Sequence, residues 1–198
     1  MFRFLMLAFF AVASAEVIYD GPCPEVKPME KFDFSAYLGT WYEISRFPHA
    51  TQEGTKGKCT TAVYTVEGDK TKAKNSHVID GVKSYIEGDL TLAEPGKLML
   101  TYTFGGVSES SYINVLDTDY KNYGILYSCK FFKDTNKHQV FAWIMSRKMT
   151  LEGAAKESVE NYLKDSKIIE KSKFVDNDYS EEACKATVTK AITEFTKP

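Results

Sequence analysis

The fold class is indicated by the stretch TKAKNSHVIDGVKSYIEGDLTL, which occupies residues 71–92. Two strand-length runs, Thr71–Ile79 and Val82–Leu92, flank the dipeptide Asp80-Gly81. This dipeptide is a strong signal for a two-residue hairpin, because glycine tolerates the positive φ that such turns require. The stretch therefore predicts two neighbouring antiparallel strands.

Similar runs recur along the chain, rich in Tyr, Val, Ile, Thr and Phe and separated by turn signals such as Gly105-Gly106. Eight are predicted as strands: Trp41–Phe47, Cys59–Val66, Thr71–Ile79, Val82–Leu92, Lys97–Phe104, Ser110–Leu116, Tyr123–Phe132 and His138–Arg147. Short links favour a meander of antiparallel neighbours. Eight such strands close into an up-and-down barrel, which is either filled by its own side chains or wide enough for one small ligand.

A single amphipathic helix is predicted over Leu151–Lys164, where apolar residues recur at helical spacing and charged residues occupy the other side. We expect it to pack against the outside of the barrel, and Lys173–Val175 to form one more short strand. The predicted fold class is therefore all-β: an eight-stranded antiparallel up-and-down barrel with one C-terminal α-helix packed outside.

The composition of the chain fits one globular domain. It has 198 residues, of which 43% are hydrophobic and 14% aromatic, so disorder is excluded. The formal net charge is −2, and the basic residues are scattered rather than gathered in a run that would follow a phosphate backbone. Nucleic acid is therefore not expected as a partner. The pattern is compatible with a monomer or a homo-oligomer.

The first fifteen residues have the features of a secretory signal peptide. Arg3 precedes the ten-residue apolar run from Phe4 to Ala13, and Ala13-Ser14-Ala15 has the small-x-small pattern of a cleavage site. The run is about half as long as a membrane-spanning helix requires. We expect residues 1–15 to be removed, residues 16–198 to form one domain, and the product to be secreted without membrane insertion. A retained anchor is the competing interpretation.

The four cysteines are Cys23, Cys59, Cys129 and Cys184. No two are close enough for a C-x-x-C motif, so neither zinc nor another metal site is indicated. In an oxidising compartment an even number of cysteines indicates disulfides, here two, and the residues alone leave three connectivities open.

Strand alternation predicts which side chains face the interior of the barrel. In the last strand Gln139, Phe141, Trp143 and Met145 share one face, and in the third strand Ala73, Asn75, His77 and Ile79 do. Inward positions elsewhere include Ser84, Ile86, Gly88, Tyr102, Phe104, Gly124, Ser128 and Lys130. Small residues on an inner wall leave space that a filled barrel would not tolerate.

The sequence therefore favours a ligand cavity that is apolar, aromatic and supplied with a few polar groups. Asn75 and His77 are the best-placed polar groups. A histidine that faces solvent or is satisfied within the fold is the competing interpretation of His77.

Three sequence blocks resemble the signatures of the lipocalins. Gly39-Thr-Trp41-Tyr-Glu43 is similar to the first block, Asp117-Thr-Asp119-Tyr120 to the second, and Arg147 to the third. The resemblance implies a lipocalin domain over residues 16–198. It also implies that Arg147 packs over Trp41 at the closed end of the barrel, in a cation–π contact.

Further segments, including Cys23-Pro-Glu-Val-Lys-Pro28 and Tyr179-Ser-Glu-Glu-Ala-Cys184, resemble the insect bilin-binding proteins and insecticyanins. This resemblance implies the disulfides Cys23–Cys129 and Cys59–Cys184. Two positions depart from the family's pattern: Ser128 stands where an aromatic residue is expected, and Glu109 where a lysine is. Strand alternation and this resemblance together give the predicted pocket residues, which are Asn75, His77, Ile86, Tyr102, Phe104, Val107, Ser128, Lys130, Gln139, Phe141 and Trp143.

The resulting expectation is a secreted, non-catalytic carrier that binds biliverdin, in the γ isomer, without a covalent bond. Aromatic walls would stack on the tetrapyrrole, Asn75 and His77 would meet its polar atoms, and Lys130 would orient a propionate. The alternative is a carrier of another small hydrophobic ligand, such as a retinoid, carotenoid, fatty acid or odorant. No catalytic motif appears, and the cysteines are all assigned to bridges, so an enzyme is not expected.

Overall fold

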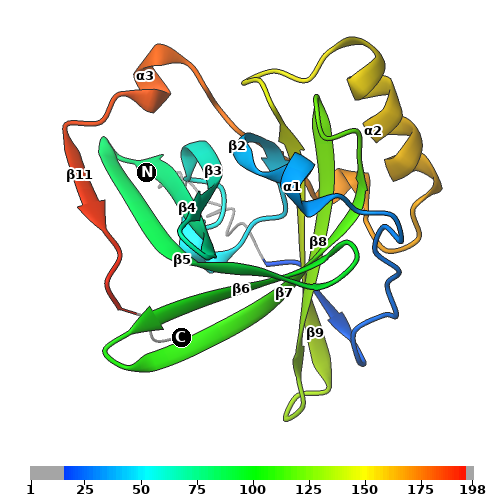
Figure 1. The fold of residues 1–198 in the computed structure, drawn as a ribbon. Coiled ribbons are helices and arrows are strands. Elements are labelled where there is room, and N and C mark those ends of the chain that lie inside the picture. Colours follow the sequence, from blue (N-terminus) through cyan, green and yellow to red (C-terminus); the bar gives the residue numbers. More distant parts are fainter. Residues whose placement is uncertain (1–15, 195–198) are drawn as a thin grey trace, which may run out of the picture.

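The structure, a computed structural model, describes residues 16–194. Its centre is a barrel of eight consecutive antiparallel strands, each hydrogen-bonded to the next along the chain (Figure 1). The strands are β2 (Gly39–Arg46), β3 (Lys58–Glu67), β4 (Lys70–Ile79), β5 (Val82–Glu94), β6 (Lys97–Phe104), β7 (Val107–Thr118), β8 (Tyr123–Phe132) and β9 (Lys137–Ser146). All eight predicted strands are present, and the predicted all-β fold is confirmed.

The barrel is closed because β9 pairs with β2 as well as with β8. The β2–β9 ladder runs from the pair Tyr42–Ser146 to the pair Arg46–Trp143. A β-bulge interrupts it between Glu43 and Ser45, so the register of this ladder skips the intervening Ile44. A bulge reverses the alternation of side chains beyond it, which places Glu43 and Arg46 on the same face of β2 although they are three residues apart.

The antiparallel order sorts the connections into two ends. The β3–β4, β5–β6 and β7–β8 connections lie at one end, together with α1 (Phe34–Tyr37) and the residues just after β9. The β2–β3, β4–β5, β6–β7 and β8–β9 connections lie at the other end. We call these the closed end and the open end, because the first is filled with side chains and the second leads into a cavity.

The closed end is packed around Trp41, which is fully buried. Its ring lies 4.8 Å from that of Tyr37 in α1, and its indole Nε1 donates to the Tyr37 carbonyl at 2.8 Å. The guanidinium carbon of Arg147 lies 3.7 Å from the centre of the Trp41 ring, which is a cation–π contact. Arg147 also donates to the carbonyls of Tyr120 and Thr40, at 3.0 and 2.9 Å.

The predicted helix is α2 (Gly153–Asp165), and it packs outside the barrel (Figure 1). Its buried residues Val159 and Leu163 join a cluster formed by outward-facing residues of β8 and β9, among them Ile125 and Val140. Within the described residues, one core therefore lies between α2 and the barrel wall and another inside the closed end.

Elements outside the barrel differ from the prediction of a single helix. Helices α1 and α3 (Glu181–Cys184) are each one turn long, too short for a helical apolar pattern to show in the sequence. The predicted strand at Lys173–Val175 begins two residues later, as β10 (Val175–Asp176), because residues 171–173 form a 3-10 turn. The remaining elements are β1 (Ile18–Asp20), η1 (Ala50–Gln52), η2 (Lys171–Lys173) and β11 (Val188–Ala191).

Two disulfides bind the termini to the barrel. Cys23 is joined to Cys129 and Cys59 to Cys184, with Cα–Cα distances of 6.0 and 5.3 Å. This is the pairing that the resemblance implies. Each bond closes a loop of more than 100 residues, a length at which the chain-entropy model gives about 4–5 kcal/mol of stabilisation.

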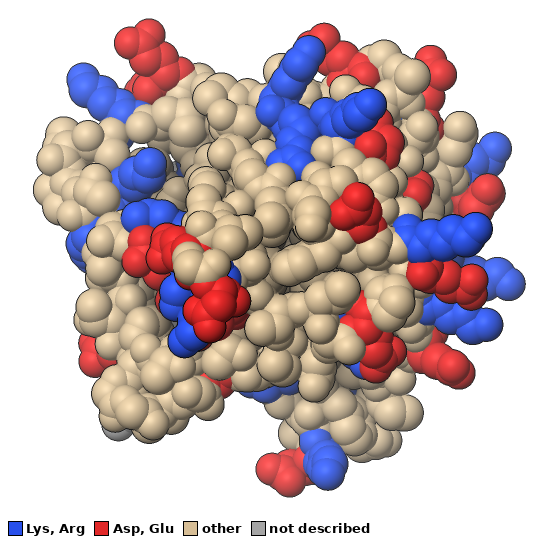
Figure 2. All heavy atoms as spheres, viewed as in Figure 1, with Lys and Arg blue, Asp and Glu red and all other residues tan. Residues whose placement is uncertain are grey.

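On the face of the molecule in Figure 2, basic and acidic side chains are mixed and lie mostly around the rim, with uncharged surface between them. Within residues 16–194, no helix is long and apolar enough to cross a membrane. The predicted signal peptide, residues 1–15, lies outside the described residues.

Candidate functional site

A cavity of about 420 Å³ opens at the open end of the barrel. This volume falls in the range of about 300–1,000 Å³ that is typical of small-molecule sites. Most of the exposed surface in the cavity is apolar. The barrel is therefore hollow at this end, whereas its closed end is filled with side chains.

Seven of the predicted pocket residues lie on the wall of this cavity. They come from five different strands: Asn75, His77, Ile86, Tyr102, Ser128, Phe141 and Trp143. Strand alternation brings them together, because each occupies an inward position of its strand. Ser128 contributes only a hydroxyl to the wall, which leaves room beside the two large rings of β9.

Four predicted residues are not on the cavity wall in the described part of the chain: Phe104, Val107, Lys130 and Gln139. Val107 is 59% exposed at the β6–β7 hairpin, and Lys130 is exposed with its Nζ 5.4 Å from the ring centre of Phe132. Gln139 is buried, at a position that pairs with Ile18 of β1. Alternation gives the face of a strand correctly but does not say how far the hollow extends along it.

Aromatic rings form one side of the cavity. The rings of Phe141 and Trp143 are nearly parallel, with an interplanar angle of 12° and a centre-to-centre distance of 6.0 Å. They are two residues apart on β9 and therefore share a face. Together they offer flat apolar surface to a planar ligand.

A hydrogen bond between two strands supplies polar atoms on the wall. Asn75 of β4 donates from Nδ2 to the hydroxyl of Tyr102 on β6, at 2.8 Å. Burial raises the pKa of Tyr102 to about 12, so its hydroxyl remains protonated at neutral pH. The amide oxygen of Asn75 and the hydroxyl hydrogen of Tyr102 can then meet ligand groups of opposite polarity.

His77 also lies on the wall, and it is held neutral. Burial lowers the pKa of its imidazole, and the nearby Arg46 guanidinium lowers it further. A neutral imidazole has one donor and one acceptor nitrogen, so it can bind a ligand without adding charge to the cavity.

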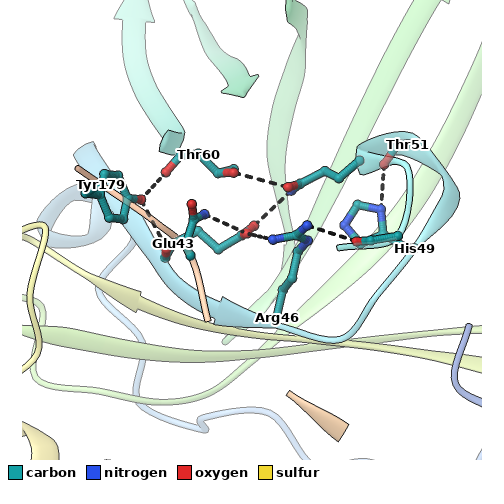
Figure 3. A network of polar contacts seen from close by, with 9 residues as sticks. Glu43, Arg46, His49, Thr51, Thr60 and Tyr179 are labelled. Atoms are coloured by element: carbon teal, nitrogen blue, oxygen red, sulfur yellow. Dashed lines mark hydrogen bonds and ion pairs between the residues drawn. The ribbon is translucent and has the colours of Figure 1, made fainter. Parts of the chain in front are cut away.

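A buried polar network borders the cavity next to the β2–β3 connection (Figure 3), and Glu43 and Gln52 are among its members on the wall. Glu43 accepts from Nη1 of Arg46 at 3.2 Å, from Gln52 at 3.1 Å and from Asn177 at 3.1 Å. Burial raises the pKa of Glu43, and the charge of Arg46 together with these donors opposes the shift. Arg46 is fully buried and also donates to the Gly54 carbonyl at 2.9 Å.

This network was not foreseen from the sequence. Glu43 and Arg46 should face opposite sides of a regular strand, and only the bulge at Ile44 brings them together. Asn177 is distant in sequence and reaches the network from the segment after β10. One signal for the network was available in the sequence. Glu43, in the first signature block, is an acidic residue three positions before the basic Arg46 on a strand whose other residues are mostly uncharged.

His49 belongs to the same wall. Its Nδ1 lies 2.6 Å from the Thr51 hydroxyl, while its buried Nε2 has no hydrogen-bond partner among residues 16–194. Its ring meets those of Phe141 and Trp143 edge to face, at 6.0 and 6.2 Å. Burial lowers the pKa of His49 to about 3, with further contributions from Arg46 and His77, so this imidazole is neutral at physiological pH.

The charged residues on the wall are acidic: Glu43, Glu109 and Glu194, with neither lysine nor arginine among the described lining residues. No group of three or more His, Cys, Asp or Glu residues within 16–194 is arranged to hold a metal ion. The wall can stack on an apolar body and offer hydrogen bonds to it.

Comparisons with known proteins agree with this geometry. The model of the lipocalin / cytosolic fatty-acid binding protein family matches residues 38–181. Insecticyanin-B of Manduca sexta is 43% identical, with 98% of each chain covered, and the bilin-binding protein of Pieris brassicae is 45% identical, with 91% of this chain and 96% of that protein covered. The solved structure of Manduca sexta insecticyanin superposes with a TM-score of 0.85 at 43% identity, over 91% of this chain and 98% of that one.

Proposed function

This chain belongs to the lipocalin / cytosolic fatty-acid binding protein family, and we propose that it is a secreted, non-catalytic carrier of a biliverdin-type linear tetrapyrrole. The observation that carries the proposal is the composition of the cavity wall. Stacked aromatic rings stand beside neutral polar groups, in a chain 45% identical to a protein named for bilin binding.

The chemistry of a bilin fits these groups. Its conjugated body is large, flat and apolar, and suits the rings of Phe141 and Trp143. Its pyrrole N–H groups and lactam oxygens need partners when buried, and Asn75, Tyr102 and His77 supply both donors and acceptors. All four cysteines are in disulfides, so no thiol is free to attach the pigment, and we infer non-covalent binding.

The propionates are the part of a bilin that the described wall does not neutralise. Glu109 and Glu194 line the cavity, whereas Lys130 lies off the wall and exposed. We infer that the propionates point out of the open end, where water solvates them and Lys130 orients one of them weakly. An exposed pair of this kind contributes at most about 1 kcal/mol.

Reconstitution tests the proposal. The purified protein, mixed with biliverdin, should turn blue-green and show a far-red absorption band that titrates to one equivalent. Comparing the γ isomer with the α isomer shows which one fits. No spectral change with either isomer would contradict the proposal.

A matched pair of variants places the pigment. Trp143→Ala removes a cavity ring and should weaken binding about tenfold, equivalent to about 1.4 kcal/mol. Tyr112→Ala removes a ring from the outer face, where Tyr112 is 51% exposed, and should leave binding unchanged. Equal effects of both substitutions would show that the pigment binds elsewhere.

The acidic lining favours one alternative, a carrier of an uncharged hydrophobic molecule such as a retinoid, a carotenoid or an odorant. A fatty acid belongs to the same class but carries a carboxylate, which the acidic residues would repel. Retinol binding without biliverdin binding, read from retinol fluorescence, would favour this alternative.

Secretion is part of the proposal. The two disulfides suit an oxidising compartment, and the predicted leader would be cut before Glu16. Expression in insect cells should give a product in the medium whose N-terminus is Glu16. A product retained in membranes with Met1 still present would indicate an anchor.

A further inference from the structure

The hydrogen-bonded ladder between β5 and β6 stops short of the open end of the barrel. In the described residues, the β5–β6 ladder begins at the pair Asp89–Thr101, so residues 82–88 of β5 extend beyond it. Gly88 lies where the two strands approach, and a Cβ at this position would come within 2.5 Å of the Thr101 carbonyl oxygen. Beyond this point the edge of β5 is free to pair with another segment.

Strand β11 occupies that edge. It pairs with β5 in parallel, from Val188–Val82 to Ala191–Tyr85. On either side of the ladder, the amide of Thr187 donates to the Gly81 carbonyl at 2.9 Å and the amide of Ile192 to the Tyr85 carbonyl at 2.8 Å. Figure 1 shows this segment running from beside the β4–β5 hairpin toward the β6–β7 hairpin.

The same segment forms part of the cavity wall. Register partners in a ladder point to the same face, so Val188 and Lys190 share the face of Val82 and Ser84. Continuing the alternation places Ile192 and Glu194 on this face too, and both line the cavity. The C-terminal segment therefore supplies wall that the barrel strands leave open.

The C-terminal segment is held firmly where it begins, at Cys184, and only weakly along the residues that follow. Up to Cys184 the chain is fixed by the Cys59–Cys184 disulfide, and Tyr179 donates from its hydroxyl to the Glu43 carbonyl at 3.0 Å. Beyond Cys184, all four residues of β11 are exposed. The segment is held mainly by backbone hydrogen bonds, and short elements with few buried apolar contacts open at low free-energy cost.

We propose that residues 185–194 are a strap that opens and closes the side of the cavity and so determines how quickly ligand enters and leaves. The strap hinges after Cys184, pairs with the edge of β5 when closed, and places Ile192 against the bound molecule. This inference rests on the proposed function only in taking the cavity as the ligand site.

A cross-link between strap and barrel tests the proposal in the full-length chain. Lys83 and Thr189 are register partners, and the double variant Lys83→Cys, Thr189→Cys is expected to form a disulfide across the ladder. Lys83→Ser, Thr189→Ser is the matched control, which cannot form the bond. Dissociation is followed by stopped-flow with two probes, biliverdin and the uncharged apolar dye N-phenyl-1-naphthylamine.

The cross-linked protein should release both probes at least about tenfold more slowly than the serine control. Ile192→Pro removes the amide that donates to Tyr85, and it should speed release about fivefold, the equivalent of one net hydrogen bond. Ile192→Ala keeps the amide and should change the rate less. Thermal unfolding checks that each variant is folded.

The outcomes separate this inference from the proposed function. Equal release rates in the cross-linked and serine variants would overturn the strap, even if biliverdin binds. Binding of the dye but not biliverdin, with rates that respond to the cross-link, would support the strap and contradict the pigment proposal. Binding of neither probe would overturn both.

Discussion

The two ends of the barrel are built from the same eight strands but differ in how completely side chains fill the interior. At the closed end large rings fill the space, and Arg147 covers Trp41 with its guanidinium at 3.7 Å. At the open end small side chains leave a cavity of about 420 Å³, bordered by the buried network of Glu43 and Arg46. The comparison indicates that dense packing is confined to one end, which leaves space for a ligand at the other.

Removing the central ring of the closed end should cause the largest loss in the free energy of unfolding. Trp41→Ala would leave a cavity beneath Arg147 and lower the free energy of unfolding by about 3–5 kcal/mol. Urea denaturation measures the loss. Tyr112→Ala, which removes an exposed ring, is the control and should change stability little. A similar loss in both variants would mean that the packing around Trp41 contributes no more to stability than an exposed ring.

Breaking the ion pair of the open end should have a similar or slightly smaller effect. Arg46→Leu leaves the buried Glu43 without its cation, and removing one partner of a buried pair typically costs about 3–5 kcal/mol. Relaxation toward the hollow cavity should place this variant at the lower end of that range. The control is Lys74→Leu, which breaks the exposed ion pair with Glu87 and should leave stability nearly unchanged.

The pH dependence of Arg46→Leu sharpens the test. Without the cation, burial should raise the pKa of Glu43 further above its ordinary value of 4.5. The folded state then holds a proton that the unfolded state has released, so stability should fall as pH rises above about 4.5. A variant equally destabilised at pH 4 and pH 7 would contradict a buried, uncompensated carboxylate.

The smallest expected effect concerns His49. Its pKa is lowered from 6.5 to about 3, so the unfolded state binds more protons between these values and stability falls as pH falls through this window. Near pH 5 the slope should be about 1 kcal/mol per pH unit. His49→Asn should flatten the profile between pH 6.5 and 4, measured by urea denaturation, while His77 leaves a residual slope because its pKa is also lowered. An unchanged slope would show that His49 is not a buried neutral group.

The regular part of the fold was accessible from the sequence because its signals are local. A two-residue hairpin at Asp80-Gly81 depends on glycine's freedom to adopt positive φ, and Gly81 has a φ of +75°. The alternation of side chains along each strand then predicted that Asn75, His77 and Trp143 face the interior of the barrel, and all three lie on the cavity wall. Lys130 and Gln139 followed the same rule and yet lie off the wall, since alternation carries no information about depth along the barrel.

What the sequence by itself determined is therefore the strand order and the inward faces, and its resemblance to the lipocalins implied the closed end marked by Trp41 and Arg147. Only the tertiary structure decided the bulge at Ile44, the encounter of Glu43 with Asn177, and the pairing of β11 with β5. The physical reason is range. Periodicity and turn chemistry act within a few residues, whereas a bulge, a buried ion pair and an added edge strand depend on which distant segment fills a space that the barrel leaves open.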